Sequence, residues 1–138
     1  MKLNKQIIGY LPGTFDLFHI GHLNIIRKAK EHCDYLIVGI NTDETCFKMK
    51  NKIPIVPFEE RCQIVEAIKY VDEVVEQNTS DRYEAWRLYK FDRIFVGSDW
   101  KGSEKWRLLE EILEKEGSEV FYFDYTEGTS STILRSKL

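Results

Sequence analysis

The sequence predicts a single α/β domain over residues 1–138, with a parallel sheet of about five strands and helices on both faces. Short apolar runs alternate with segments in which apolar residues recur every three or four positions, as in parallel sheets. The run at 35–40 is continuous rather than alternating, which favours a strand covered on both sides. No linker or internal repeat divides the chain. This pattern is typical of a Rossmann-like fold, in which a ligand lies across the carboxyl ends of the strands.

Each element is expected from its own local pattern. Strands are predicted at residues 7–11, 35–40, 71–75, 94–96 and 120–123. Pro12 is expected to end the first strand, because proline cannot donate to a sheet ladder. Helices are predicted at 21–32, at 58–68, around the aromatic residues at 83, 86 and 89, and over a segment that Ser103 caps and Gly117 ends. Residues 125–132 are expected to open a short final helix.

The stretch from Gly13 to His22 has the composition of an anion-binding junction between a strand and a helix. Gly13 and Gly21 allow backbone N–H groups to approach a ligand, and a helix that begins near His19 directs its unpaired N–H groups toward an anion. His19 and His22 are three residues apart, so both imidazoles are expected on one face of the first turn. Each ring can donate to a phosphate oxygen whether it is neutral or protonated.

Two simpler explanations compete with this interpretation. The His-x-x-His spacing could hold a metal ion, but no nearby carboxylate or paired cysteine completes a ligand set, so no metal site is predicted. A single histidine is more often an ordinary surface or core residue. The surrounding glycines and the Phe15-Asp16 pair favour the binding role instead.

Three lysines, Lys48, Lys50 and Lys52, alternate along a segment that Pro54 and Pro57 are expected to keep out of regular structure. Taken alone, this segment is an ordinary solvated basic loop. It leaves the predicted sheet at its ligand edge, however, where ammonium groups can fold over a polyphosphate and neutralise its charge.

Composition excludes several classes of protein. The chain is 43% hydrophobic and 31% charged, which is ordinary for a globular domain. No apolar run approaches the roughly 20 residues of a membrane span, no signal peptide is evident, and the three unpaired cysteines fit a reducing compartment, so a cytoplasmic protein is expected. A formal net charge of −3 gives no field for nucleic acid, so a nucleotide partner is expected to be a small molecule.

The residues from 13 to 22 resemble the Gly-Thr-Phe-Asp-x-x-His-x-Gly-His signature of the nucleotidyltransferases. Three further stretches share the family pattern, YLIVGINTDE, FEERCQIVEAIKYVDEVV and TEGTSST, with VGSDW as a weaker fourth. The resemblance covers nearly the whole chain. The sequence is therefore identified as a cytidylyltransferase-like member of this superfamily, of the glycerol-3-phosphate cytidylyltransferase type.

The resemblance implies a reaction and its partners. An alcohol phosphate, most simply glycerol 3-phosphate, attacks the α-phosphate of CTP, pyrophosphate leaves and a CDP-alcohol such as CDP-glycerol results, as in the synthesis of cell-wall or capsule polysaccharide precursors. Mg²⁺ is expected on the triphosphate. A homodimer is implied, with a contact near the second helix and residues 70–72. Arg61 and Lys69 are expected either at that contact or in surface salt bridges.

The resemblance also implies roles for individual residues. His19, His22 and Lys50 are the catalytic candidates. The acceptor is expected to contact Asp16, Lys48 and Arg82. The nucleotide is expected to contact Thr14, Phe15, His19, Gly21, His22, Lys50, Asp99, Thr126, Glu127, Gly128, Thr129, Ser130, Ser131 and Thr132.

The sequence leaves several alternatives open. Tyr125 stands where these enzymes commonly have arginine, and Arg135 or a loop lysine is expected to replace that charge. An extra residue in the lysine segment relative to the family makes Lys52 an alternative to Lys48 or Lys50. The run 130–135 also resembles the ending of some adenylyltransferases, so ATP remains an alternative to CTP. Glycerol 2-phosphate, another polyol phosphate and phosphocholine are alternative acceptors. A nucleotide sensor without turnover is the alternative from another class.

Overall fold

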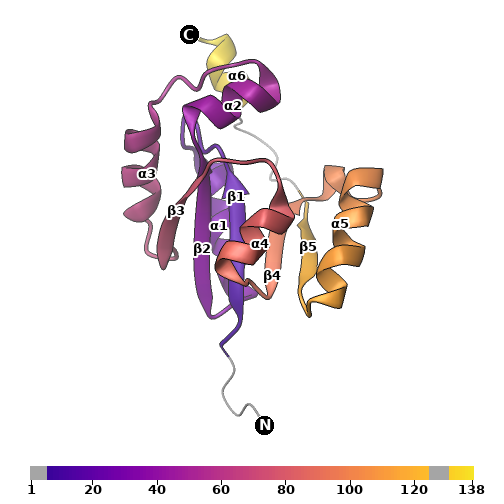
Figure 1. The fold of residues 1–138 in the computed structure, drawn as a ribbon. Helices are drawn as coiled ribbons and strands as arrows, with labels where there is room; N and C mark the ends of the chain where they lie inside the picture. Colours follow the sequence, from indigo (N-terminus) through magenta and orange to yellow (C-terminus); the bar gives the residue numbers. More distant parts are fainter. Residues whose placement is uncertain (1–5, 125–130) are drawn as a thin grey trace.

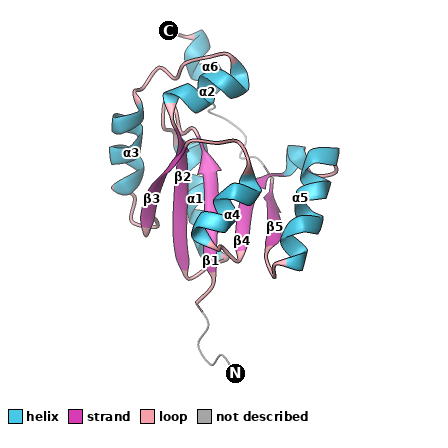
Figure 2. Cartoon of the chain, in the orientation of Figure 1, coloured by secondary structure: helices cyan, strands magenta, loops and turns pink. Residues whose placement is uncertain are grey.

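The computed structural model describes residues 6–124 and 131–138 as an open parallel sheet with helices packed against it (Figure 1). Figure 2 shows the strands at the centre and the helices around them. Along the chain the elements are β1 (Ile8–Gly13), α1 (Ile20–Glu31), β2 (Tyr35–Asn41), α2 (Asp43–Lys50), α3 (Phe58–Glu66), β3 (Glu73–Gln77), α4 (Arg82–Tyr89), β4 (Arg93–Gly97), the 3-10 turn η1 (Ser98–Trp100), α5 (Glu104–Lys115), β5 (Glu119–Phe123) and α6 (Ser131–Ser136).

The five strands lie in the order β3-β2-β1-β4-β5, and each pairs with its neighbours in parallel. From β1 the chain moves outward through β2 to β3, then returns to the other side of β1 for β4 and β5. The order therefore reverses between the carboxyl ends of β1 and β4, where ligands bind in such sheets. The predicted five-stranded parallel sheet is confirmed.

Helices cover both faces of the sheet, as predicted. On one face Ile26 of α1 and Val65 of α3 are fully buried against the strands. On the other face Ala85 of α4 and Trp106 and Leu113 of α5 pack into a second apolar cluster. A central strand between two such layers has no solvated side, which explains the continuous apolar run of β2.

A buried polar contact joins three of the strands beneath the ligand edge. Tyr10 of β1 is fully buried, and Gly39 of β2 leaves room for it, since a Cβ at Gly39 would collide with the Tyr10 hydroxyl. That hydroxyl donates to Oε1 of Gln77 at the end of β3. Nε2 of Gln77 in turn donates to the Thr79 carbonyl. Both polar atoms of this buried amide therefore have partners.

The prediction that Pro12 ends the first strand is wrong. β1 continues to Gly13, and Pro12 lies in register with Gly39 of β2. The pairing of β1 with β4 covers only Gly9 and Tyr10. Because β4 does not pair with β1 beyond Tyr10, the missing N–H of Pro12 faces no ladder on that side.

The prediction that the lysine segment is irregular is wrong as far as Lys50. Thr42 caps α2 by accepting a hydrogen bond from the Thr45 N–H at 3.0 Å, and Asn51 ends the helix with a left-handed φ of 55°. Acidic residues occupy the first turn and lysines the last, which complements the helix dipole. Pro54 lies beyond the helix and limits only the irregular segment after it.

The remaining helices agree with the predictions more closely. The Ser103 hydroxyl accepts from the Trp106 N–H at the start of α5, and Gly117 follows the helix with a φ of 79°. The spacing of Trp106, Leu109, Ile112 and Leu113 predicts one buried face, but Ile112 is 41% exposed. Within residues 6–124 and 131–138, no helix is long and apolar enough to cross a membrane.

Candidate functional site

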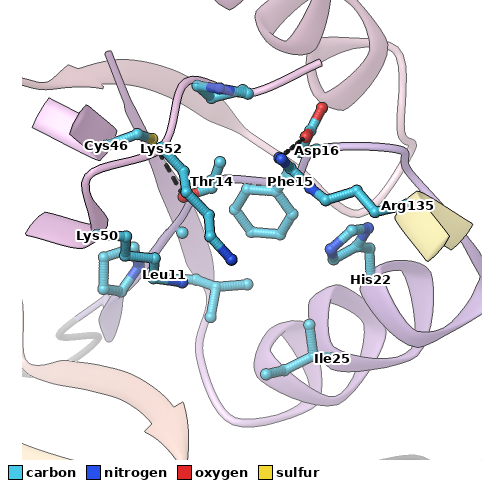
Figure 3. A pocket seen from close by; sticks show the side chains of 13 residues that line it. Leu11, Thr14, Phe15, Asp16, His22, Ile25, Cys46, Lys50, Lys52 and Arg135 are labelled. Atoms are coloured by element: carbon cyan, nitrogen blue, oxygen red, sulfur yellow. Dashed lines mark hydrogen bonds and ion pairs between the residues drawn. The ribbon is translucent and has the colours of Figure 1, made fainter. Parts of the chain in front are cut away.

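A cavity of about 530 Å³ opens at the carboxyl end of β1 (Figure 3). Its lining comes from the β1–α1 junction, α1, α2, the segment after α2, and α6. The polar side chains in that lining are Thr14, Asp16, His22, Lys50, Lys52 and Arg135. The cavity therefore lies at the sheet edge where the sequence predicts a ligand.

His19 and His22 form a reciprocal capping box at the start of α1. His19 is the N-cap, and its Nδ1 accepts from the Gly21 N–H at 3.0 Å. The His19 N–H donates to Nδ1 of His22 at 3.2 Å. The Gly21 N–H, expected to face an anion, is thus used within the protein. Since each Nδ1 accepts a backbone hydrogen bond, the proton of each neutral ring must be on Nε2.

Burial favours the neutral form of both imidazoles. Burial lowers the pKa of His22 to about 4; the nearby His19 adds to this effect and the Asp16 carboxylate opposes it. Burial also lowers the pKa of His19. The two ring centroids are 4.0 Å apart. A neutral ring with Nδ1 engaged can still donate from Nε2, so this pair presents two donors without two charges.

The loop before the histidines has an unusual backbone. Phe15 has a φ of 56° and Leu17 a φ of 51°, both left-handed, on either side of Asp16. A Cβ at Gly13 would lie 2.7 Å from the Phe15 ring, so glycine is needed for that ring to fold back. Left-handed non-glycine residues cost about 1–2 kcal/mol each and persist where the surroundings hold them, commonly at functional sites.

Asp16 is a buried clamp. Its two carboxylate oxygens accept from the backbone N–H groups of Ile55 and Val56 at 2.9 and 2.8 Å. The Arg135 guanidinium pairs with the same carboxylate (Figure 3). Burial raises the pKa of Asp16, but these donors outweigh it, so the pKa lies below its usual value. The carboxylate thereby holds the segment after α2 and α6 against the site loop, and its contact with the acceptor stays a prediction.

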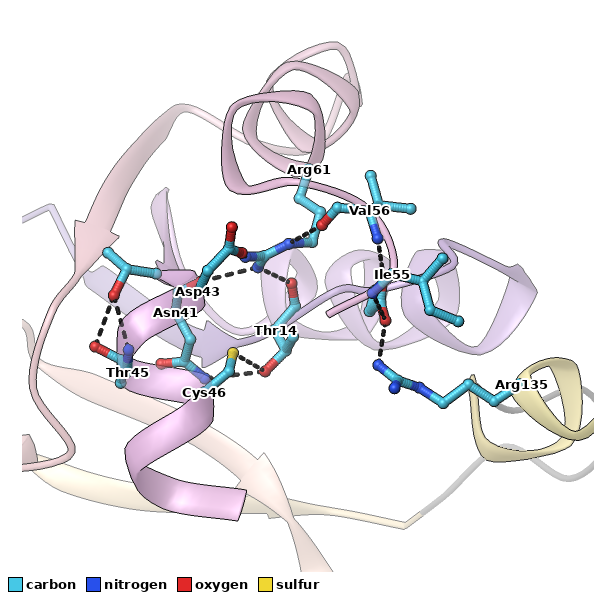
Figure 4. Close-up of polar contacts among 11 residues, drawn as sticks. Thr14, Asn41, Asp43, Thr45, Cys46, Ile55, Val56, Arg61 and Arg135 are labelled. Carbon is cyan, nitrogen blue, oxygen red and sulfur yellow. Dashed lines mark hydrogen bonds and ion pairs between the residues drawn. The ribbon is translucent and has the colours of Figure 1, made fainter. Parts of the chain in front are cut away.

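Arg61 is the main site residue that the sequence interpretation missed. It is 1% exposed and donates to the carbonyls of Val56, Thr14 and Asn41 and to the Asp43 carboxylate. These contacts join the ends of β1 and β2, the start of α2 and the segment before α3 (Figure 4). The expected surface or dimer role for Arg61 is therefore wrong.

A sequence signal for Arg61 does exist. It follows Phe58 by three residues and precedes Val65 by four, which is the spacing of one helix face. Val65 is fully buried and Phe58 packs against the same core. An arginine inside the apolar stripe of a helix implies a buried cation whose donors are satisfied by the protein.

The structure separates the three lysines. Lys50 and Lys52 line the cavity, whereas Lys48 is 73% exposed and pairs with Glu44 on the surface of α2. Residues two apart in a helix point in nearly opposite directions, while residues two apart in an extended loop share a side. Because α2 is helical, Lys48 does not share the side of Lys50.

The other predicted contacts are distributed as follows. Arg82 is in the first turn of α4 and lines a different cavity, between α4 and α5, with Lys105 and Trp106. Asp99 belongs to η1 at the end of β4, as expected for the ligand edge. Residues 126–130 lie outside the described residues. Ser131 and Thr132 begin α6, and their side chains and that of Asp99 are likewise outside the description.

The charges that face the cavity suit a polyphosphate. Lys50 and Lys52 supply cations, and Arg135 supplies a third that is paired with the Asp16 carboxylate. Among the residues that the structure describes, no group of three or more histidine, cysteine or acidic side chains could hold a metal ion.

Together, a parallel sheet with a switch point, a helix start that presents two imidazole donors, and a basic cavity beside it define a nucleotide-binding α/β protein. Comparison with known families sharpens this class. A model of the cytidylyltransferase-like family matches residues 10–137, and the chain belongs to that family.

The relatives agree with this assignment. A glycerol-3-phosphate cytidylyltransferase of Bacillus spizizenii is 38% identical, over 97% of this chain and 97% of its own length. One of Staphylococcus aureus is 36% identical, over 97% and 95%. The structure of a lipopolysaccharide core biosynthesis protein from Thermoplasma volcanium matches with a TM-score of 0.74 and 26% identity, over 91% of this chain and all of that one. The predicted class, a CTP-dependent nucleotidyltransferase, is confirmed.

Proposed function

We propose that this protein transfers CMP from CTP to glycerol 3-phosphate, giving CDP-glycerol and pyrophosphate. Relatives that carry the name of this activity align along nearly the whole chain. The observation that carries the proposal is the His19–His22 pair, whose Nδ1 atoms are both engaged beside a cavity with three cations.

The chemistry needs no protein nucleophile. A phosphate oxygen of the acceptor is already anionic and attacks the α-phosphorus in line, and the bond to the leaving pyrophosphate breaks. The protein supplies position and positive potential. Nε2–H of His19 and of His22 donates to the α-phosphate oxygens as charge builds there. Lys50 neutralises the leaving pyrophosphate, and Arg135, which is paired with Asp16, adds positive potential beside it.

Mg²⁺ fits this site as part of the bound triphosphate rather than as a resident ion. Asp16, the carboxylate in the cavity lining, already accepts two backbone N–H donors and pairs with Arg135, which makes it a poor ligand for a resident ion. When bound, the ion would supply charge neutralisation on the phosphates.

The remaining site predictions belong to the same proposal. Residues 126–132 and Asp99 are proposed to bind the nucleotide, and Arg82 the acceptor phosphate. Lys52 takes the place that the sequence analysis gave to Lys48, because it faces the cavity. The protein is further proposed to be a cytoplasmic homodimer that produces a wall or capsule precursor. Arg61 is not part of that dimer contact, because its donors are used within the chain.

The test is pyrophosphate release in the presence of Mg²⁺. CTP with glycerol 3-phosphate should give release, while glycerol 2-phosphate and phosphocholine serve as alternative acceptors. Tight CTP binding with no release from any acceptor would favour the nucleotide sensor and contradict the proposal.

ATP is the second candidate nucleotide, and the position of one residue favours it. Arg135, which ends the stretch that resembles adenylyltransferases, lines the cavity. Release with ATP and none with CTP would establish adenylyl transfer instead.

A further inference from the structure

The side chain of Asn41, which lies behind the cavity wall, has no part in the roles described above. Asn41 is the last residue of β2 and is 5% exposed, and its Nδ2 donates to Oγ1 of Thr14 at 3.1 Å. Oγ1 of Thr14 is also 3.4 Å from Sγ of Cys46 (Figure 4). Thr14 and Cys46 line the cavity, whereas Asn41 is buried outside its lining.

The contact from Asn41 sets the direction in which the Thr14 hydroxyl donates. An amide N–H can only donate, so it occupies a lone pair of Oγ1 and the hydroxyl proton of Thr14 must point elsewhere. The other contact in the structure is Cys46 Sγ, which is a weak acceptor. A phosphate oxygen is a much stronger acceptor, so a polyphosphate in the cavity would take this proton.

The amide of Asn41 is only half satisfied. Its Oδ1 is buried and has no hydrogen-bond partner within the described part of the chain. Gln77, which lies in register with Asn41 on the neighbouring strand β3, has both amide atoms paired. An unpaired buried oxygen lowers stability, and an apolar side chain of similar size would avoid that loss. The N–H of Asn41 therefore has a use beyond the fold.

We propose that Asn41 is a positioning residue that makes the Thr14 hydroxyl a hydrogen-bond donor to a phosphate oxygen of the substrate. The inference rests on the proposed function only in that the ligand carries a polyphosphate. In this role the buried Asn41 amide at the end of β2 does not contact the ligand itself, but orients the Thr14 side chain at the end of β1.

The first test compares Asn41→Leu with Gln77→Leu. Asn41→Leu should lower kcat/KM for CTP about tenfold, the scale of one hydrogen bond to a charged group, and should leave Tm unchanged or higher. Gln77→Leu, the matched control, should lower Tm because the buried Tyr10 hydroxyl loses its partner, with kcat/KM within twofold of the parent. An Asn41→Leu variant with parental kcat/KM would overturn the proposal.

The second test asks whether Asn41 acts through Thr14. Thr14→Val removes the hydroxyl, so adding Asn41→Leu to it should cause no further loss. If the two substitutions together lowered kcat/KM by the product of their separate effects, the proposal would be overturned. Asn41→Asp replaces the donor by an acceptor that captures the Thr14 proton, so it should reduce activity more than Asn41→Leu. Parental activity in Asn41→Asp would mean that Asn41 accepts rather than donates.

Calorimetric titration with pyrophosphate separates this inference from the proposed reaction. Weaker pyrophosphate binding in Asn41→Leu than in the parent supports the positioning role even if CTP is not turned over. Equal affinities in the two proteins would contradict it, whether or not the parent releases pyrophosphate from CTP.

Discussion

The histidine pair at the start of α1 and the arginine at the start of α3 are both polar centres beside the same cavity, yet they use their donors differently. Arg61 makes four hydrogen bonds within the chain and is 1% exposed. His19 and His22 each engage only Nδ1, and within residues 6–124 and 131–138 neither Nε2 has a partner.

The difference separates groups that build the site from groups that act in it. A guanidinium whose donors are satisfied within the chain fixes the loop ends around it but has little left for a ligand. An imidazole held at one nitrogen is oriented, while its other nitrogen stays available. Substitution of the first kind should therefore reduce stability, and substitution of the second kind should reduce turnover.

Arg61 should give the largest effect. Arg61→Met leaves the Asp43 carboxylate and three backbone carbonyls without their donor, so the free energy of unfolding in urea should fall by about 3–5 kcal/mol. Arg61→Lys should recover only part of this, because an ammonium lacks the planar fork that reaches several carbonyls. If Arg61→Met had parental stability, Arg61 would not be a residue that stabilises the site.

His22 should give the next largest effect, on rate rather than stability. His22→Ala removes one preorganised donor, so kcat should fall by roughly 10²–10³. The free energy of unfolding should change by only about 1 kcal/mol, the scale of a lost helix cap. His32→Ala is the matched control, since that ring packs against Phe121 rather than the cavity. Near-parental kcat in a folded His22→Ala protein would reject the role proposed for this ring.

Asp16 is one of the groups that build the site, and its contribution to stability should depend on pH. Its folded pKa lies below the usual value, so its contribution to stability is complete above about pH 4 and is lost as pH falls through the folded pKa. Asp16→Asn should lower the free energy of unfolding by about 1–3 kcal/mol at pH 7, and the difference from the parent should shrink by pH 3. Urea denaturation at both pH values measures this. Asp124→Asn is the control, because Asp124 is exposed. It should change the free energy of unfolding by less than about 0.5 kcal/mol at either pH.

The smallest expected effect is a difference in the KM for CTP between variants of Lys50 and Lys48, two lysines of α2. Lys50→Ala should raise the KM for CTP by about tenfold, because it removes a charge from the cavity wall. Lys48→Ala, on the exposed side of α2, should change that KM by less than about twofold. Steady-state kinetics on both variants decides the point. A larger effect at Lys48 would mean that α2 rearranges when substrate binds.

The sequence predicted the site where local pattern and chemistry coincide. Gly13, His19 and His22 lie close together along the chain, so their junction with β1 and α1 could be inferred from spacing. Thr42 before two acidic residues is the pattern of a helix start, but the prolines after the lysines led us to expect an irregular segment there. That single misassignment put Lys48 on the wrong side.

Other site residues depend on contacts between distant segments. Asp16 meets Arg135 from 119 residues away, and Arg61 meets Thr14 from 47. Neither pairing leaves a period or motif in the chain, because a local pattern reports only on neighbours along the same helix or strand.

The sequence by itself determined the parallel α/β architecture and the position of His19 and His22 at the start of a helix, since both follow from short-range periodicity and from residue types with few alternative uses. Only the tertiary structure decided which side chains are already satisfied. Asp16 and Arg61 both hold separate segments together, because their hydrogen-bond partners come from other parts of the chain. The His19–His22 pair kept its outward donors because the partners of both rings come from α1's own first turn.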